Sequence, residues 1–156
     1  QVDDLVRWMK YPPFGERALF MGANVDYQDA DAERYCREAN QATMLVLKIE
    51  SRLGVENAEQ MMANEWVDGV VFGPGDLAAS MGFHGGWQHP EILAAMESVI
   101  EIALARGIAV EPAEFPSDSS EFERQKERGI QIFGPTRQTE YQLLKEAAER
   151  ALAAYR

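Results

Sequence analysis

The sequence predicts an α/β fold in which parallel strands alternate with helices. Short apolar runs at residues 43–50, 67–72, 108–111 and 130–133 are separated by segments with helical spacing. Strands that alternate with helices along a chain are typical of βαβ units and a parallel sheet. No internal repeat, low-complexity segment or flexible linker divides the chain, so residues 1–156 are predicted to form a single domain.

The elements of the first half follow from periodicity and from helix breakers. Residues 17–20 are predicted to form a short strand, and residues 22–28 a loop. Acids in the first turn favour a helix over residues 29–41. The strand at residues 43–50 precedes a helix predicted for residues 55–64. A first helix is predicted before the Pro-Pro pair, from the spacing of Val2, Leu5, Val6 and Met9.

The second half contains clearer boundaries. The segment over residues 73–88 is rich in glycine and is predicted to be a long loop. His89 and Pro90 start a helix that Gly107 ends. A helix is predicted for residues 121–128 and another near the C-terminus. The last helix is predicted to pack one apolar face against the core, formed by Tyr141, Leu144, Ala148, Ala151, Leu152 and Tyr155.

Composition excludes several function classes. The net charge of −11 repels nucleic acid and anionic membranes, and no basic patch offsets it. No stretch approaches the ~20 apolar residues of a membrane span, and no signal peptide is visible. Cys36 is the only cysteine, which predicts a reducing, cytoplasmic location. The chain begins at Gln1 with a helical pattern under way, so we expect a piece of a longer product.

Two acids close neighbouring apolar runs. Glu50 ends one run, and Asp76 follows the next run after Gly73, Pro74 and Gly75. The carboxyl ends of strands are where α/β folds bind ligands. Carboxylates suit a hard divalent cation, and a glycine turn can offer backbone amides to an anion. The alternative for this turn is a tight strand-to-helix connection with Asp76 as the helix N-cap.

Lys48 complicates this interpretation. Strand alternation places Lys48 on the same face as Glu50, one layer deeper, so we expect a buried lysine that needs a partner. Glu50 or Asp76 could be that partner. A structural ion pair at the rim and a metal site are equally compatible with the spacing.

Other polar residues are weaker candidates. His89 is predicted to cap its helix, and His84 lies in a glycine-rich loop, where an ordinary loop role is favoured over that of a base. Cys36 is predicted to pack within a helix. Glu111 and Glu114 flank a proline at a strand end; they could join the site, but solvated loop acids are the preferred interpretation.

Three segments together resemble the HpcH/HpaI family of class II pyruvate aldolases. They are Tyr-Pro-Pro-Phe-Gly-Glu-Arg at residues 11–17, Leu-Lys-Ile-Glu-Ser at residues 47–51, and Val-Asp-Gly-Val-Val-Phe-Gly-Pro-Gly-Asp-Leu at residues 67–77. Ser-Met-Gly at residues 80–82 and His-Pro-Glu at residues 89–91 extend the third match.

The resemblance implies a (β/α)8 TIM barrel that assembles into homo-oligomers, usually hexamers. It implies a carbon–carbon lyase that cleaves or forms aldol products of 2-oxo acids and aldehydes through a pyruvate enolate, with Mg, Mn or Co as cofactor. By motif position Glu50 and Asp76 look like the metal ligands. The turn formed by Gly73, Pro74, Gly75 and Asp76 looks like the site for the substrate carboxylate.

The chain departs from the family in several respects. A full barrel needs ~250 residues, so 156 residues resemble its second half, without the first strands. The catalytic base is therefore expected outside this chain, and Arg17 and Lys48 are only weak catalytic candidates within it. Lys48 stands where the family usually has glutamine, and the aldehyde specificity does not carry over.

Three other functions compete with the metal-dependent aldolase. Lys48, with its pKa lowered by crowding, could form a Schiff base with a keto acid. A citrate-lyase-type acyl-CoA lyase would also use paired acids and a metal. A non-catalytic barrel remnant that binds a metal or keto acid would explain the missing base.

Overall fold

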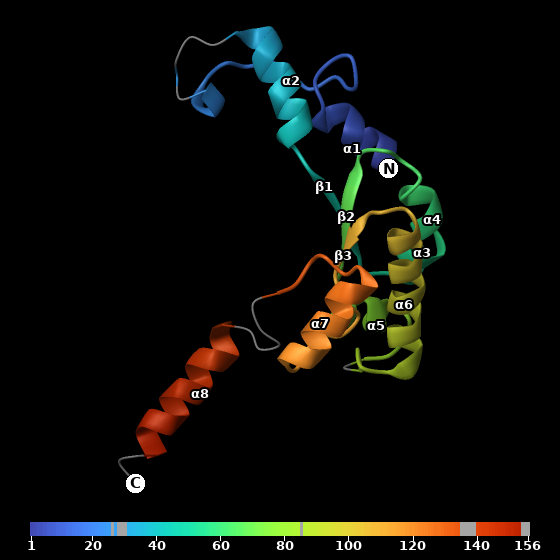
Figure 1. Ribbon diagram of the computed structural model, residues 1–156, viewed down its shortest axis with the longest axis vertical. Helices are drawn as coiled ribbons and strands as arrows, with labels where there is room; N and C mark the ends of the chain where they lie inside the picture. Colours follow the sequence, from blue (N-terminus) through green and yellow to red (C-terminus); the bar gives the residue numbers. More distant parts are fainter. Residues whose placement is uncertain (26, 28–30, 85, 135–139, 154–156) are drawn as a thin grey trace.

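A three-stranded parallel sheet forms the centre of the computed structural model, which describes residues 1–25, 27, 31–84, 86–134 and 140–153. The strands are β1 (Leu45–Ile49), β2 (Val67–Phe72) and β3 (Ala109–Val110), and their order in the sheet follows the chain, β1-β2-β3. Both strand pairs are parallel, so the predicted βαβ arrangement is confirmed. Figure 1 shows the helices of the middle of the chain on one side of this sheet.

Helices account for most of the remaining described chain. No described helix is long and apolar enough to cross a membrane. The helices are α1 (Val2–Met9), α2 (Ala32–Ala42), α3 (Arg52–Glu56), α4 (Ala58–Met61), α5 (Pro74–Ser80), α6 (Pro90–Ala105), α7 (Ser119–Arg128) and α8 (Glu140–Ala153), with a 3₁₀ turn η1 (Ala23–Val25).

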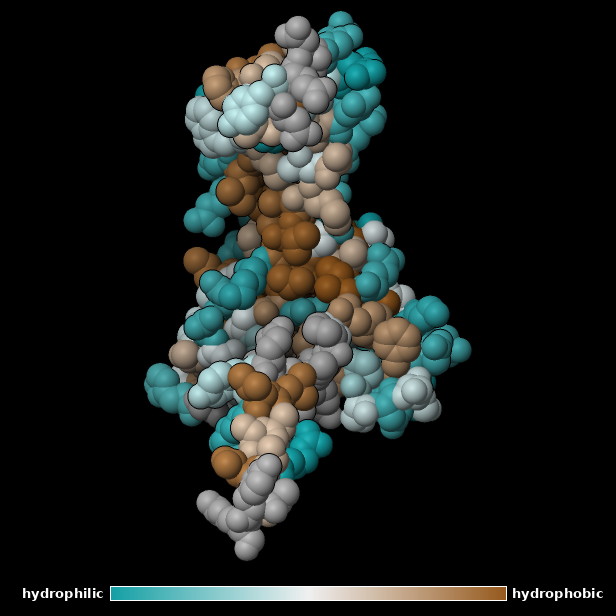
Figure 2. All heavy atoms as spheres, turned by 90° about the vertical axis from the view of Figure 1, so that its left-hand side faces the viewer, coloured by the Kyte–Doolittle hydropathy of each residue, from teal (hydrophilic) through white to brown (hydrophobic). Residues whose placement is uncertain are grey.

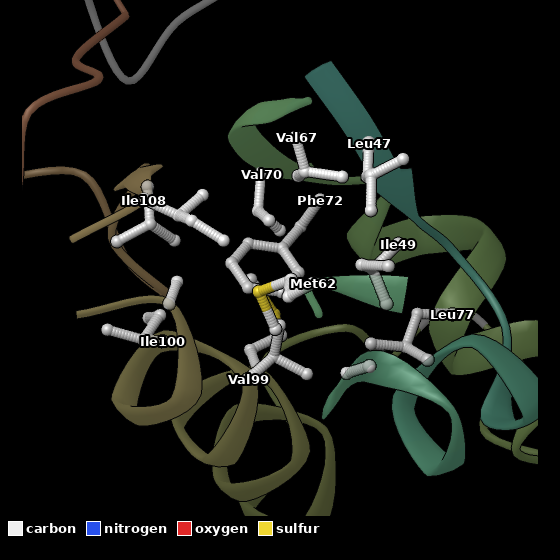
Figure 3. Packing of buried hydrophobic residues seen from close by; sticks show 14 of the residues in the cluster. Leu47, Ile49, Met62, Val67, Val70, Phe72, Leu77, Val99, Ile100 and Ile108 are labelled. Atoms are coloured by element: carbon white, nitrogen blue, oxygen red, sulfur yellow. The ribbon is translucent and has the colours of Figure 1, made fainter. Parts of the chain in front are cut away.

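The register of β1 and β2 divides their side chains between two faces. Ile49 pairs with Phe72, and both are buried against the helices. Figure 3 shows these side chains packed with Val99 of α6, which is fully buried. Lys48 pairs with Val71, and both belong to the opposite face. The core therefore fixes which strand residues are free to form a site.

Helix α6 confirms the sequence signals at both of its ends. The Nδ1 atom of His89 accepts a hydrogen bond from the Glu91 amide at 3.3 Å, and Pro90 occupies the first turn. Gly107 follows the C-terminus with φ of 69°, a left-handed conformation that favours glycine.

The face of the sheet away from α6 is open. Figure 2 looks onto this side and shows apolar residues gathered between the upper and lower parts of the molecule. Val46 belongs to this face and is 42% exposed. A groove of about 1380 Å³ also follows β1 and α1, and Glu50 lies among its lining residues. The strand ends are thus accessible from outside.

Several predicted boundaries were wrong in the first two-thirds of the chain. Residues 17–20 form no strand, and the helix expected over residues 55–64 is instead α3 and α4, separated at Asn57. The Asn57 side-chain amide donates to Leu53 O at 2.7 Å, a local bond that competes with a continuous helix. Residues 73–88 are not all loop, because α5 begins at Pro74.

The fourth predicted strand, residues 130–133, is also absent. The amides of Gln131 and Ile132 both donate to the same acceptor, Val110 O, at 3.3 and 3.2 Å, so no ladder extends along this segment. β3 itself is short, since Pro112 follows it closely and has no amide to continue the ladder.

The prediction that α8 packs against the core was wrong. Tyr141, Leu144 and Leu152 are 78%, 69% and 62% exposed. Figure 1 shows α8 set apart from the sheet and its covering helices. Its apolar face is therefore exposed to solvent in this chain, and Tyr155 of the predicted stripe lies outside the described residues.

Candidate functional site

Glu50 is fixed by the elements on either side of it. The strand before it is held by the bond from the Gly73 amide to Ile49 O at 2.9 Å. The helix after it is capped by Ser51, whose Oγ accepts from the Gly54 amide at 3.1 Å. The backbone at Glu50 therefore has little freedom, and its side chain leaves the carboxyl end of β1.

Gly73 makes the space that the Glu50 side chain occupies. A Cβ atom at residue 73 would lie 2.8 Å from both Cβ and Oε2 of Glu50 and 3.1 Å from Cε of Lys48. Any side chain at this position would push the carboxylate away. The backbone φ of Gly73 is −107°, so the requirement for glycine is steric. The absence of a side chain at Gly73 is therefore what allows Glu50 to take its position in the site.

Asp76 lies in the first turn of α5. Gly73, not Asp76, is the N-cap of this helix, so the predicted capping alternative for Asp76 was wrong. The Leu77 amide donates to Gly73 O at 2.8 Å, and Leu77 is fully buried, which anchors the helix start. Asp76 and Gly75 are exposed, and a Cβ at Gly75 would meet nothing within 4 Å. The carboxylate and the turn therefore face open space.

Lys48 differs from its prediction. Its side chain is 56% exposed instead of buried, and Nζ forms an ion pair with Glu50 Oε2 at 2.8 Å. The hydrogen bond and charge of Glu50 raise the pKa of Lys48, and the charges of Asp76 and Glu111 raise it further. The expectation of a lowered pKa was wrong because acids surround this ammonium on the open face of the sheet.

Glu111 belongs to the same group of charges, and the preference for a solvated loop acid was wrong. Its Oε1 accepts a hydrogen bond from the Phe72 amide, in the place where the carbonyl of a longer β3 would continue the ladder. Burial raises the pKa of Glu111, while the Phe72 amide and Lys48 lower it to a smaller extent. An acid at a strand end directly before Pro112 was the available signal in the sequence.

The charges around Lys48 suit a divalent cation. Three carboxylates, those of Glu50, Asp76 and Glu111, act electrostatically on one ammonium group. A cation of charge two would balance the excess of negative charge, and hard oxygen ligands suit Mg²⁺ or Mn²⁺. Among the described residues no three His, Cys, Asp or Glu side chains are grouped closely enough to hold an ion. Water or substrate oxygens would complete the shell, which is usual for Mg²⁺.

Arg17 lies elsewhere in the structure. Its guanidinium stacks on the Tyr11 ring at 4.9 Å, and its amide donates to Lys10 O. The Lys10 ammonium in turn donates to Thr43 O at 2.7 Å, just before β1 begins. These contacts tie Arg17 to the start of β1, whereas Glu50 follows the end of that strand.

The remaining candidates have structural surroundings. His89 caps α6, as predicted. Its ring also stacks on Phe83, with ring centroids 4.0 Å apart. His84 is exposed in a turn. Cys36 is a free thiol, partly buried in α2, in agreement with a packing role. None of these three belongs to a group of three or more side chains that could hold a metal among the described residues.

Substitution of Gly73 tests the steric role of this position. The Gly73→Ala variant should lower the free energy of unfolding by about 1–3 kcal/mol, because its Cβ overlaps Glu50. Gly75→Ala is the matched control and should be at least as stable as the parent, since its Cβ meets open space and alanine suits a helix. Urea unfolding measures both. Equal stability of the two variants would contradict the steric argument.

The raised pKa of Glu111 predicts a pH-dependent stability. The folded chain binds this proton more tightly than the unfolded chain, so the contribution of Glu111 to stability is present below the ordinary pKa and is lost as the pH rises through the folded pKa. Glu111→Gln cannot ionise and keeps an oxygen for the Phe72 amide. Its stability relative to the parent should therefore increase from about pH 4 to about pH 7.5.

Urea unfolding at the two pH values gives this difference, with Glu101→Gln on the exposed side of α6 as the control that should not change. A difference between Glu111→Gln and the parent that is the same at both pH values would show that the folded chain does not perturb this carboxyl.

Two sets of known proteins resemble the chain in sequence. Residues 1–133 match the family HpcH/HpaI aldolase/citrate lyase. A 2-keto-3-deoxy-L-rhamnonate aldolase of Klebsiella pneumoniae is 33% identical over 118 residues, which are 72% of this chain and 44% of the relative. The protein of the same description from Salmonella typhi is 32% identical over the same shares. The chain thus spans less than half the length of these curated relatives.

Solved structures of HpcH/HpaI proteins also resemble the chain in fold. An HpcH/HpaI aldolase from Desulfitobacterium hafniense superposes with a TM-score of 0.80 at 26% identity, covering 98% of this chain and 58% of that one. An HpcH/HpaI aldolase/citrate lyase family protein from Burkholderia cenocepacia gives 0.78 at 28%, covering 99% and 60%. These likenesses confirm the predicted fold class, a part of a (β/α)8 barrel with parallel βα units. The chain belongs to the HpcH/HpaI aldolase/citrate lyase family.

Proposed function

We propose that this chain carries the metal and carboxylate sites of a divalent-metal-dependent aldolase for 2-oxo acids. The reaction would make or break the carbon–carbon bond between a pyruvate enolate and an aldehyde. Family membership and the relatives described as 2-keto-3-deoxy-L-rhamnonate aldolases support a lyase of this kind. The observation that carries the proposal is the Glu50 carboxylate over Gly73, with the charges of Asp76 and Glu111 acting on the same lysine that Glu50 binds.

Glu50 and Asp76 are the residues that would hold Mg²⁺, Mn²⁺ or Co²⁺. Each carboxylate follows the end of a neighbouring strand, and both are exposed at the same side of the sheet as Lys48. Two protein carboxylates leave room in the shell for substrate oxygens. A divalent ion held there would supply a Lewis acid for the negative charge that develops on the substrate oxygen.

The turn from Gly73 to Asp76 is suited to the substrate carboxylate. The amides of Gly75 and Asp76 belong to the first turn of α5, where amides have no partner within the helix. The absence of a side chain at Gly75 lets an anion approach the backbone closely. Pro74 has no amide and holds the start of the helix in place. These groups would orient a 2-oxo acid without taking part in proton transfer.

The proton acceptor and the aldehyde site are expected from outside this chain. Arg17 is engaged with Tyr11, and Lys48 is protonated more firmly than a free lysine, so neither is suited to take a proton from the substrate. Homo-oligomer formation is a further expectation from the family. The raised pKa of Lys48 also argues against the Schiff-base alternative, which requires a neutral amine at neutral pH.

Metal binding tests the proposed ligands directly. Glu50→Gln and Asp76→Asn should each weaken Mn²⁺ binding at least about tenfold, as removal of a ligand or its close support does. Glu101→Gln makes the same charge change on α6 and should bind Mn²⁺ as the parent does. Isothermal titration calorimetry gives the three affinities. If Glu50→Gln binds Mn²⁺ as tightly as the parent, the assignment of the ligands is wrong.

A further inference from the structure

The ion pair between Lys48 and Glu50 occupies the place where the proposed metal would bind. Nζ of Lys48 lies 2.8 Å from Oε2 of Glu50, a distance that gives a charge-assisted hydrogen bond. The pair fills the gap above Gly73, since a Cβ there would meet both side chains. One oxygen of the main proposed ligand is therefore already bound to a positive charge.

The ion pair between Lys48 and Glu50 is exposed to solvent and can separate at low cost in free energy. Lys48 is 56% exposed and Glu50 is 45% exposed, and exposed pairs of this kind contribute little to stability. Asp76 and Glu111, whose charges also act on Lys48, are acids. If Lys48 turned away, its place would be surrounded by negative charge that a cation could balance. The Lys48 ammonium is the positive charge that pairs with Glu50, and the charges of Asp76 and Glu111 act on it as well.

We propose that Lys48 is the internal counter-ion of this site: it holds the Glu50 carboxylate when no metal is bound, and a divalent cation must displace it. This inference rests on the proposed function, because it takes Glu50 as a metal ligand. Lys48 thereby sets how much cation is needed to load the site. Its positive charge opposes the ion twice, by occupying Oε2 and by repulsion at short range.

Calorimetric titration of the chain with Mn²⁺ alone tests this role without any measurement of activity. Lys48→Gln should bind Mn²⁺ at least about tenfold more tightly than the parent, because it removes both the competitor and the repulsion. Lys48→Arg keeps the charge and should bind much as the parent does. Lys126→Gln is the matched control, since Lys126 forms an exposed pair with Glu123 in α7 and has no contact with the site.

A second measurement follows the lysine itself. In NMR spectra of the parent, titration with diamagnetic Mg²⁺ should move the side-chain signals of Lys48 towards those of a free lysine. The signals of Lys126 should not move. Resonances of Lys48 that stay unchanged while Mg²⁺ saturates the site would overturn the displacement.

The outcomes separate this inference from the proposed function. If Lys48→Gln binds Mn²⁺ no more tightly than the parent while Glu50→Gln abolishes binding, the counter-ion role is wrong and the metal site stands. If Glu50→Gln does not affect binding, the proposed function fails. Absence of Mn²⁺ binding in both the parent and Lys48→Gln overturns both.

Discussion

The parallel pairing of β1 with β2 is the constraint on which the candidate site depends. The register that buries Ile49 opposite Phe72 also brings the Gly73 amide to Ile49 O at 2.9 Å. Glu50 must then project over Gly73, where only glycine leaves it room. Burial of the hydrophobic faces against α6 thus determines the position of a polar side chain on the other face. Core packing sets the strand register, and the register sets the position of Glu50. The backbone geometry of the site is therefore as rigid as the core.

Carboxylates also complete the hydrogen bonding of the sheet at both ends of β2. Asp68 lies at the irregularity between two pairs of the β1–β2 ladder, and its Oδ2 accepts from the Leu45 amide at 2.7 Å. At the other end Glu111 accepts from the Phe72 amide. A short sheet with acids at its ends satisfies its backbone without longer strands. Because Glu111 is bound to the Phe72 amide, its charge acts on Lys48 and adds to the negative charge of the candidate site.

Sequence patterns predicted the central strands and the longer helices, whereas the short strands expected at residues 17–20 and 130–133 are absent. The run at β2 ends where expected because Asn64 and Gly73 lie close to its boundaries, and the capping signals of α6 were clear. Glu50 and Asp76 were singled out as candidates because acids are rarely buried at the ends of apolar strands, and their role as metal ligands stays a prediction. The exposure of Lys48 and of Tyr141 could not be predicted, since strand alternation and helical periodicity assume a neighbouring layer. In the described chain the open face of the sheet and the surroundings of α8 lack that layer.

In the proposed site, a cation held by Glu50 and Asp76 would in turn hold a 2-oxo acid at the Gly75 turn. Paramagnetic relaxation of the C2 carbon of ¹³C-labelled pyruvate tests it most directly, because relaxation by Mn²⁺ falls steeply with distance. We expect strong relaxation of C2 with the parent and Mn²⁺, and its loss when Asp76→Asn replaces the parent. Relaxation by Mn²⁺ that is equally strong with Asp76→Asn, or no stronger with the parent than with Mn²⁺ alone, would contradict it.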